Sequence, residues 1–457
     1  MNCPTASRRM TRRRQLEIAI ALLGALLALA IAARAQDARA TLTLDQAIQQ
    51  ALQHNRLIKN EELEAAKFVD YVEIARTRRL PEFEFDALAL QPFTGVDFRF
   101  NRGVLGAIPG VGPFPLQDTR VGTGHQPFTL LTARVSQPLT QLRRINLGIQ
   151  LQQVNQELAV NKLEAQRRAV ANQVKRAYYA MLQTQSALAA IQETLKLHRE
   201  LDRVVGEYVV QKVVLAADSL DVKARLANDE YEAVKLQNAL AAQQEQLNLL
   251  LGRDLRTQFN VVNVTDNVLY ELSLDAAQNR ALSDRSEVRA ARLQQRQAEL
   301  QRRLRKAERL PDVSLTLGYF APIGVGVLPR QVFGAGVSVK WEPFDWGRKR
   351  RELAVAEKNI AQAGNALREA EAQVLLDVNT RFRKLEEARA LLHVVQIAQQ
   401  AAQEKLRVAS NKFKQEAALL KDVLQTQAAV ADANHQYQQA LLALLAARAD
   451  FEKALGE

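Results

Sequence analysis

The chain has 457 residues, of which 25% are charged and only 5% are aromatic, and its formal net charge is +12. Abundant Ala, Leu, Gln and Arg with few aromatic residues are typical of long helices and coiled coils rather than of a globular enzyme. The five His show no metal-ligand spacing, and no nucleophile or phosphate-binding motif is present. We therefore expect no catalytic residues, no metal and no cofactor.

Residues 1–35 have the features of a signal peptide. An Arg-rich start precedes an apolar run from Ile18 to Ala32, and Ala33-Arg34-Ala35 follows as a cleavage site. An uncleaved anchor helix is the alternative. Cleavage removes Cys3, the only cysteine, and net +5 of the charge, which leaves +7. No later apolar run approaches about 18 residues, so a mature chain within a membrane would have to use strands.

In chain order, the mature sequence reads as two repeats, residues 36–270 and 271–457. Leu42-Thr43-Leu44-Asp45 recurs 230 residues later as Leu272-Ser273-Leu274-Asp275, and Val174, Tyr178 and Asp218 match Val378, Phe382 and Asp422 204 residues later. Such regular recurrence indicates a tandem duplication. The difference of 26 residues falls in the Gly/Pro-rich stretch 91–127, so the first strand hairpin should have the longer loop.

Each repeat is predicted to contain short helices, a strand hairpin and a long helical hairpin. The strand hairpins are expected at about 82–139 and 312–344, and the helical hairpins at about 143–251 and 348–455. Apolar and polar residues alternate over about ten residues, which is the length of a tilted strand that crosses a bilayer. The alternation is weaker in the return strand near 128–139. Heptads with a stutter predict long helices that lie side by side.

Four such strands cannot close a barrel, because the smallest barrels need about eight, and an open edge leaves backbone groups unpaired in lipid. Copies of the chain must therefore pool their strands. Two copies would give eight strands and a plugged barrel, whereas three would give twelve and a water-filled lumen. The residues alone thus predict an oligomeric conduit in an outer membrane.

The duplicated pattern resembles the TolC outer-membrane efflux family. The resemblance is carried by the Leu-x-Leu-Asp-x-Ala starts, the Leu-Pro before each first strand, Gln137-Pro138-Leu139, Glu342-Pro343-Phe344-Asp345-Trp346-Gly347-Arg348, Asp422-Val423-Leu424 and the Leu-Gly helix ends. It implies a mixed α and β homotrimer, with a twelve-stranded outer-membrane barrel and a long periplasmic barrel of helices. It also implies an exit duct of a tripartite efflux pump or type I secretion system, with a periplasmic adaptor and an inner-membrane transporter as partners.

The sequence departs from the family pattern in two places. Leu142 stands where the second repeat has Gly347, and the helical turns 211–217 and 414–420 lack the glycine that is usual in the family. Two rival interpretations remain. A periplasmic adaptor should show one helical hairpin flanked by small β domains, and a structural coiled coil would need neither strands nor export. The transported substrate is not predicted.

Acidic and basic residues near the helical turns are candidates for a periplasmic gate. Asp218 and Asp422 occupy equivalent positions, and the resemblance matches Asp422 to an aspartate of the family's gate ring. In a trimer each Asp becomes a ring of three that attracts cations. Nearby Lys side chains would latch neighbouring helices by ion pairs; they are Lys212, Lys414 and Lys421. Simple helix capping by Asp is the alternative.

Two further sets lie on the strands. Acidic residues on the polar faces are predicted to favour cations in the lumen, or merely to keep the strand starts hydrated; they are Glu82, Glu84, Asp86 and Asp312. Aromatic residues are predicted to form the membrane girdles, or to pack between helices; they are Phe83, Phe85, Tyr319, Trp341, Phe344 and Trp346.

Basic clusters occur at all four junctions between strands and helices. We expect a collar that touches anionic headgroups of the inner leaflet, although any one cluster could be a solvated helix face. Its members are Arg78, Arg79, Arg143, Arg144, Arg302, Arg303, Arg348, Lys349, Arg350 and Arg351. The export signal and the lack of interleaved aromatic residues argue against nucleic acid as a partner.

Overall fold

The computed structural model describes residues 40–95, 97–122, 125–212, 215–264, 273–324, 329–415, 417 and 420–457. The predicted signal peptide, with Cys3, lies outside these residues. The chain forms two compact units. The helical unit consists of the residues up to Asn60, Glu164–Arg285 and Gln373–Glu457, and the strand unit consists of Glu61–Leu163 and Ser286–Ala372. Each unit therefore takes residues from both predicted repeats.

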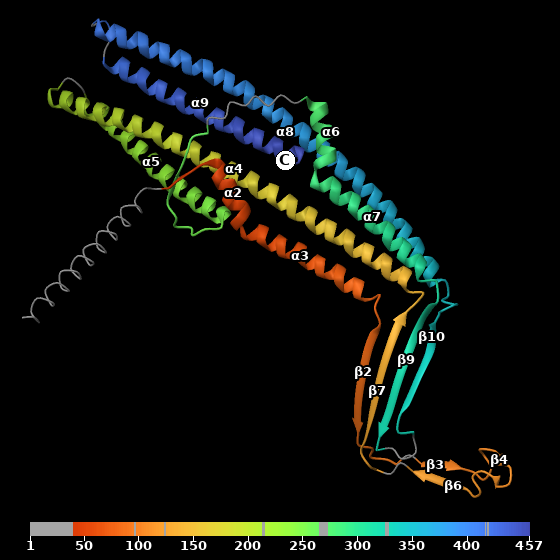
Figure 1. The fold of residues 1–457 in the computed structure, drawn as a ribbon. Coiled ribbons are helices and arrows are strands. Elements are labelled where there is room, and N and C mark those ends of the chain that lie inside the picture. Colours follow the sequence, from red (N-terminus) through yellow and green to blue (C-terminus); the bar gives the residue numbers. More distant parts are fainter. Residues whose placement is uncertain are drawn as a thin grey trace, which may run out of the picture. The chain divides into compact units, whose positions relative to one another are not determined.

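The described part of each predicted repeat contains two short helices and two long ones (Figure 1). In the first repeat they are α2 (Leu44–His54), α3 (Arg56–Thr77), α4 (Leu142–Val210) and α5 (Ala216–Leu251). In the second they are α6 (Leu274–Asp284), α7 (Ser286–Ala307), α8 (Arg348–Lys414) and α9 (Leu420–Leu455). With 69 and 67 residues, α4 and α8 are each about 100 Å long. Long helices combined with strands confirm the predicted fold class.

The strand unit contains a four-stranded antiparallel sheet in the order β10-β9-β7-β2. Its strands are β2 (Glu82–Leu90), β7 (Phe128–Pro138), β9 (Asp312–Ile323) and β10 (Val332–Lys340). In the described residues β2 and β10 are the edges, and all nine residues of each are exposed. Each edge presents backbone groups that no described strand pairs with, so the sheet is open on both sides.

The strand register assigns every residue of the sheet to one of two faces, because directly opposed residues of antiparallel strands point the same way. One face, which we call the polar face, carries charged and hydroxyl side chains over the half nearest the helices: Glu82, Glu84, Asp86, Thr132, Arg134, Ser136, Asp312, Ser314, Thr316, Ser338 and Lys340. Farther from the helices this face becomes apolar at Leu88, Leu130 and Phe320.

The opposite face, which we call the apolar face, is built from aromatic and aliphatic side chains. Its members include Phe83, Phe85, Ala87, Ala133, Val135, Val313, Leu315, Leu317, Tyr319, Phe333, Val337 and Val339. Apart from the single buried residue Ala321, their side chains are exposed or half-buried in one copy of the chain. An apolar face of this extent needs a nonaqueous neighbour.

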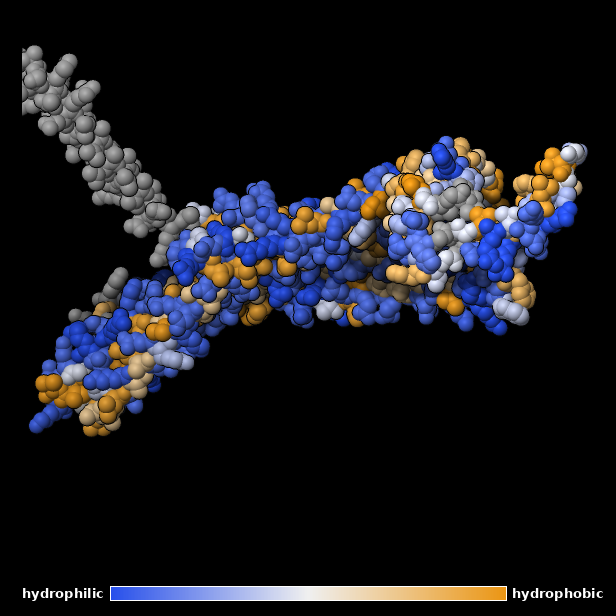
Figure 2. Space-filling view, turned by 90° about the horizontal axis from the view of Figure 1, so that it is seen from below, coloured by the Kyte–Doolittle hydropathy of each residue, from blue (hydrophilic) through white to orange (hydrophobic). Residues whose placement is uncertain are grey.

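The long segment between β2 and β7 carries two small hairpins. Its first ribbon pairs β3 (Asp97–Phe100) with β6 (Thr119–Gly122), and its tip pairs β4 (Ala107–Ile108) with β5 (Gly112–Pro113). Apolar residues such as Leu105 and Phe114 are exposed there. Figure 2 shows hydrophobic surface near the tip of this projecting segment, whereas the surface of the long helices is mainly hydrophilic.

The helical unit is held around a buried tyrosine. A short parallel pair, β1 (Ala40–Leu42) and β8 (Phe259–Val261), lies beside α4. The Tyr178 hydroxyl accepts a hydrogen bond from the Val262 backbone N–H and lies 2.8 Å from the Leu42 carbonyl oxygen. Burial raises the pKa of Tyr178, so the hydroxyl keeps its proton for donation to a carbonyl.

Candidate functional site

The polar face of the sheet brings together all four predicted acidic residues. Glu84 lies directly opposite Arg134, with 3.9 Å between their charged atoms. Asp312 accepts a hydrogen bond from Arg144 at 3.0 Å. Sequence reasoning missed Arg134, although its position in the alternation of β7 would have placed it on this face. The acidic face is therefore partly neutralised.

A cleft of about 980 Å³ lies where the polar face meets the helices of the strand unit. Its wall combines apolar side chains such as Tyr71 and Leu304 with charged side chains of Arg78, Glu82 and Arg144. Such a wall can make both polar and apolar contacts with a bound solute. Arg78 and Arg144, which were predicted for the lipid collar, both line this cleft.

A second cleft, of about 600 Å³, lies at the junction of β10 with α8. Asp345 holds the start of α8: its carboxylate accepts hydrogen bonds from the backbone N–H groups of Lys349 and Gly347, each at 3.0 Å. These bonds, that of Lys349 first, lower the pKa of Asp345 below its ordinary value. The carboxylate thus acts as a helix cap.

The predicted collar residues fall into two groups. Four are engaged with carboxylates: Arg144 with Asp312, Arg302 with Glu357, Arg348 with Glu342 and Glu352, and Lys349 with Glu342. The other six have no carboxylate partner among the described residues; they are Arg78, Arg79, Arg143, Arg303, Arg350 and Arg351. Sequence reasoning did not include Arg309, which also lacks such a partner in the described part of the chain and lines the second cleft.

The predicted aromatic residues lie at two levels of the sheet. Phe83 lies on the apolar face near the helix-proximal end, and Phe85 and Tyr319 lie one row farther out on that face, both opposite Ala133, with Phe333 on the other side of Tyr319. Phe333 was not predicted. Trp341, Phe344 and Trp346 follow β10, and the rings of Phe344 and Trp346 pack edge to face with centroids 4.7 Å apart. All six predicted aromatic side chains are exposed in one copy of the chain.

The predicted gate residues lie at the ends of the long helices. Asp218 and Asp422 are in the first turns of α5 and α9, where their charge favours the helix dipole. The residue preceding α5 is Leu215, which makes no side-chain cap. Lys212 follows α4, and Lys414 and Lys421 lie in α8 and α9. The predicted ion-pair latch stays a prediction.

Within the described ranges, no group of three or more His, Cys, Asp and Glu side chains is arranged to hold a metal ion. None of the described helices combines the length and the apolar character of a membrane span.

Comparison with known proteins gives the sequence and the fold a context. Residues 277–457 match the model of the outer membrane efflux protein family, and no curated protein sequence matches the chain. Three solved structures share the fold of this chain, each over 90% of its residues. They are the CmeC outer membrane channel of Campylobacter jejuni (14% identity, TM-score 0.72, 85% of that chain), the outer membrane protein VceC of Vibrio cholerae (15%, 0.69, 96%) and the open state of the MtrE outer membrane channel of Neisseria gonorrhoeae (18%, 0.66, 88%).

Residues 277–457 thus match the outer membrane efflux protein family, and 90% of the chain shares the fold of solved outer-membrane channels. This confirms the predicted family and an outer-membrane location with long helices extending from the strands. It also favours the efflux-channel interpretation over an adaptor or a structural coiled coil. The family is one of channels and not of enzymes.

The structure accounts for one departure from the efflux-protein pattern. Leu142 is the first residue of α4, whereas Gly347 lies outside α8 with φ at +84°. The first repeat therefore begins its long helix one residue earlier and has no need of a left-handed residue there.

The other departure concerns the glycine that efflux proteins usually carry in their helical turns. Lys212 adopts the left-handed conformation, with φ at +61°, in the first turn. A non-glycine residue there carries a strain of about 1 kcal/mol. The first turn thus keeps the left-handed geometry without a glycine.

Proposed function

We propose that three copies of this chain form the outer-membrane channel of a tripartite efflux pump or type I secretion system. The observation that supports this best is the sheet itself, which has one apolar face, one face with charged residues and two open edges. Pairing β2 of one copy with β10 of the next would close a barrel of twelve strands and satisfy both edges. Lipid would then cover the apolar face, and water would fill the lumen.

The proposed channel is a passive exit duct. A periplasmic adaptor would dock on the long helical hairpins, and an inner-membrane transporter would supply the substrate and the energy. We propose no catalysis, cofactor or metal in the duct. The proposed gate lies at the turns of the helical hairpins, where rings of Asp422 and Asp218 hold the periplasmic end closed together with Lys212, Lys414 and Lys421.

The proposal is tested by single-channel conductance of the purified mature chain in a planar bilayer. We expect a trimer that forms a mostly closed, cation-preferring pore, and a larger open fraction for Asp422→Ala. Asp432→Ala is the matched control, because Asp432 is an exposed carboxylate on the same helix but away from the turn. Absence of conductance from properly trimeric protein would overturn the duct, and equal opening by both variants would overturn the gate.

A further inference from the structure

We propose that the cleft between the end of α7 and the start of α8 binds the phosphate of a phospholipid headgroup. We call it the α7–α8 cleft; its charged and aromatic lining residues are Arg309, Trp341, Glu342, Asp345, Lys349, Arg350 and Glu357. The inference rests on the proposed function, because it requires the sheet to lie in a membrane. It differs from the predicted collar, which treats all the basic clusters alike and omits Arg309.

Two guanidinium groups of the cleft are not paired with carboxylates of the described residues and are available to bind an anion. Glu342 lies within 3.5 Å of the Lys349 ammonium and also pairs with Arg348. Asp345 is occupied by backbone N–H groups, and Glu357 lies 3.9 Å from Arg302. Arg309 and Arg350 are exposed and have no acidic partner among the described residues.

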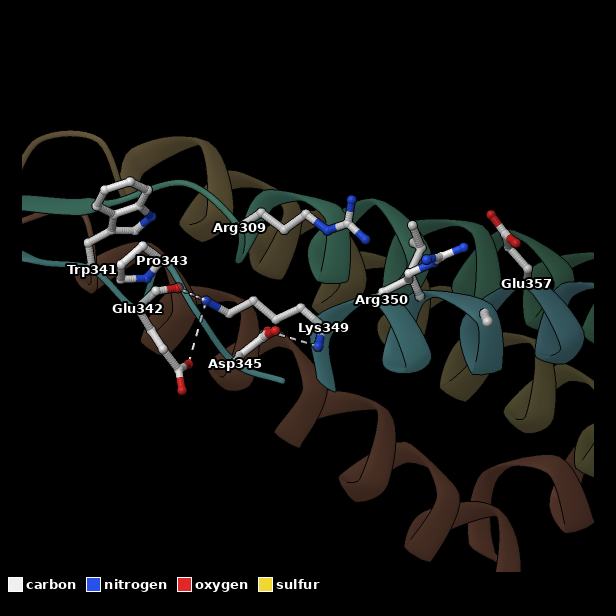
Figure 3. Close-up of a pocket in the computed structure, with 10 residues that line it drawn as sticks. Arg309, Trp341, Glu342, Pro343, Asp345, Lys349, Arg350 and Glu357 are labelled. Carbon is white, nitrogen blue, oxygen red and sulfur yellow. Dashed lines mark hydrogen bonds and ion pairs between the residues drawn. The ribbon is translucent and has the colours of Figure 1, made fainter. Parts of the chain in front are cut away.

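The two available arginines reach the cleft from different elements. Figure 3 shows Arg309 extending from the turn that follows α7 and Arg350 from the first turn of α8, while Lys349 is turned toward Glu342. Two like charges held on one cleft repel each other, and a shared anion removes that repulsion. The guanidinium fork matches the oxygens of a phosphate in a bidentate manner.

The position of the cleft favours a lipid as the source of the phosphate. Trp341 follows Val339 of the apolar face by two residues, so the alternation carries it to the helix-proximal end of that face. Its side chain is 59% exposed. Tryptophan at the end of a lipid-facing surface lies at the level of the headgroups. Leu353 and Ala354 add apolar wall beside the arginines, which suits the glycerol and first methylene groups of a lipid.

Trp341 also supplies a local probe. The chain has two Trp, Trp341 and Trp346, so Trp346→Phe leaves Trp341 alone. The trimer in non-ionic detergent is titrated with dihexanoylphosphatidylglycerol, and the Trp341 emission is recorded. We expect saturable binding that Arg309→Gln with Arg350→Gln weakens about tenfold or more. Arg309→Lys with Arg350→Lys keeps the charge but loses the fork, so an intermediate loss is expected.

The matched control is Arg303→Gln with Arg351→Gln, which removes the same charge from α7 and α8 outside the cleft. We expect its affinity to stay within about twofold of the parent, because exposed charges outside the cleft act only through screened fields. Equal losses in the two glutamine pairs would show diffuse attraction and overturn the site. Inorganic phosphate that shifts Trp341 emission at the same concentrations as the lipid would overturn the lipid as ligand.

Conductance of the same preparation separates this inference from the proposed function. A conducting parent trimer without saturable lipid binding would overturn the α7–α8 cleft alone. A trimer that never conducts would overturn the duct, whatever the titration gives. We expect the Arg309→Gln, Arg350→Gln trimer to conduct like its parent, since neither side chain lies on the polar face of the sheet.

Discussion

The two repeats close the ends of α5 and α9 with different chemistry. In the first repeat the buried Asn55 donates a side-chain hydrogen bond to the Leu250 carbonyl oxygen at 2.8 Å. At the equivalent position of the second repeat, the Arg285 guanidinium donates to the Ala454 carbonyl oxygen at 3.2 Å and pairs with Asp377 at 3.0 Å. A neutral amide and a cation thus satisfy the same helix-end carbonyl.

The difference extends beyond the helix ends. In the second repeat Arg381 contacts Asp377 and Asp450 at 3.2 and 3.0 Å. The corresponding positions of the first repeat hold Gln173, Ala177 and Gln246. One backbone arrangement can therefore be held by neutral groups or by an ionic network, and only the ionic network should respond strongly to salt.

The largest expected effect concerns the glycines that follow the two helices. Gly252 has φ at +70°, and a Cβ there would lie 2.3 Å from the His54 carbonyl oxygen; at Gly456, φ is +91° and the corresponding distance to Asp284 is 3.0 Å. We expect Gly252→Ala to cost about 3 kcal/mol and Gly456→Ala about 1 kcal/mol in urea unfolding of the helical unit. Gly364→Ala, within α8, should be slightly stabilising. Equal costs at Gly252 and Gly456 would contradict the comparison.

Removing the two helix-end donors should cost somewhat less. Asn55→Ala leaves the Leu250 carbonyl without its hydrogen bond, and also the Leu57 backbone N–H, which donates to the Asn55 side chain at 2.9 Å. We expect the free energy of unfolding to fall by about 2 kcal/mol. Arg285→Ala should cost a similar amount at low salt and clearly less at high salt. The measurement is urea unfolding at two ionic strengths. A salt-dependent cost for Asn55→Ala would remove the distinction between the repeats.

A third difference lies within the helical hairpins. His198 of α4 contacts Asp229 of α5, both largely buried, whereas the second repeat has Ala402 and Ala433 at these positions. A double-mutant cycle with His198→Ala and Asp229→Ala should give a coupling of about 1 kcal/mol. The exposed pair of Arg199 and Glu230, 3.2 Å apart, is the control and should give about 0.3 kcal/mol. Equal couplings would show that the buried pair does not fasten the first hairpin.

The smallest effect concerns the turns that lead into α4 and α8. Asp345 caps α8 with a lowered pKa, while Thr140 at the equivalent place donates to Pro311 and does not titrate. Because the pKa is lowered in the folded state, the ionised cap stabilises the turn fully at pH values above the ordinary pKa of a carboxyl group. This stabilisation is lost as the pH falls through the lowered pKa. In a Trp341→Phe background, Trp346 emission should therefore change at acidic pH. Asp345→Asn should abolish that change, and its persistence would assign it to another group.

The two faces of the sheet could be predicted from the sequence, because alternation needs no knowledge of partners. The charge pairs could not. Asp312 meets Arg144, 168 residues earlier, and that meeting depends on the register of β9 against β7. Arg309 was missed for a related reason. It ends a run of basic residues that look alike in the sequence, and only the fold determines which of them pair with carboxylates. The start of α4 at Leu142 could not be predicted either, because it lies one residue earlier than the start of α8 at the matched position of the second repeat.

In the proposed channel, the polar face lines a water-filled duct while the apolar face meets lipid. Cys3 is the only cysteine of the sequence and lies in the predicted signal peptide, so Ser136→Cys and Val135→Cys each place one thiol on adjacent residues of β7 that point to opposite faces. The measurement is single-channel conductance during exposure to a water-soluble cationic thiol reagent. We expect stepwise loss of current for Ser136→Cys and none for Val135→Cys. Loss of current for Val135→Cys with an unaffected Ser136→Cys channel would contradict it.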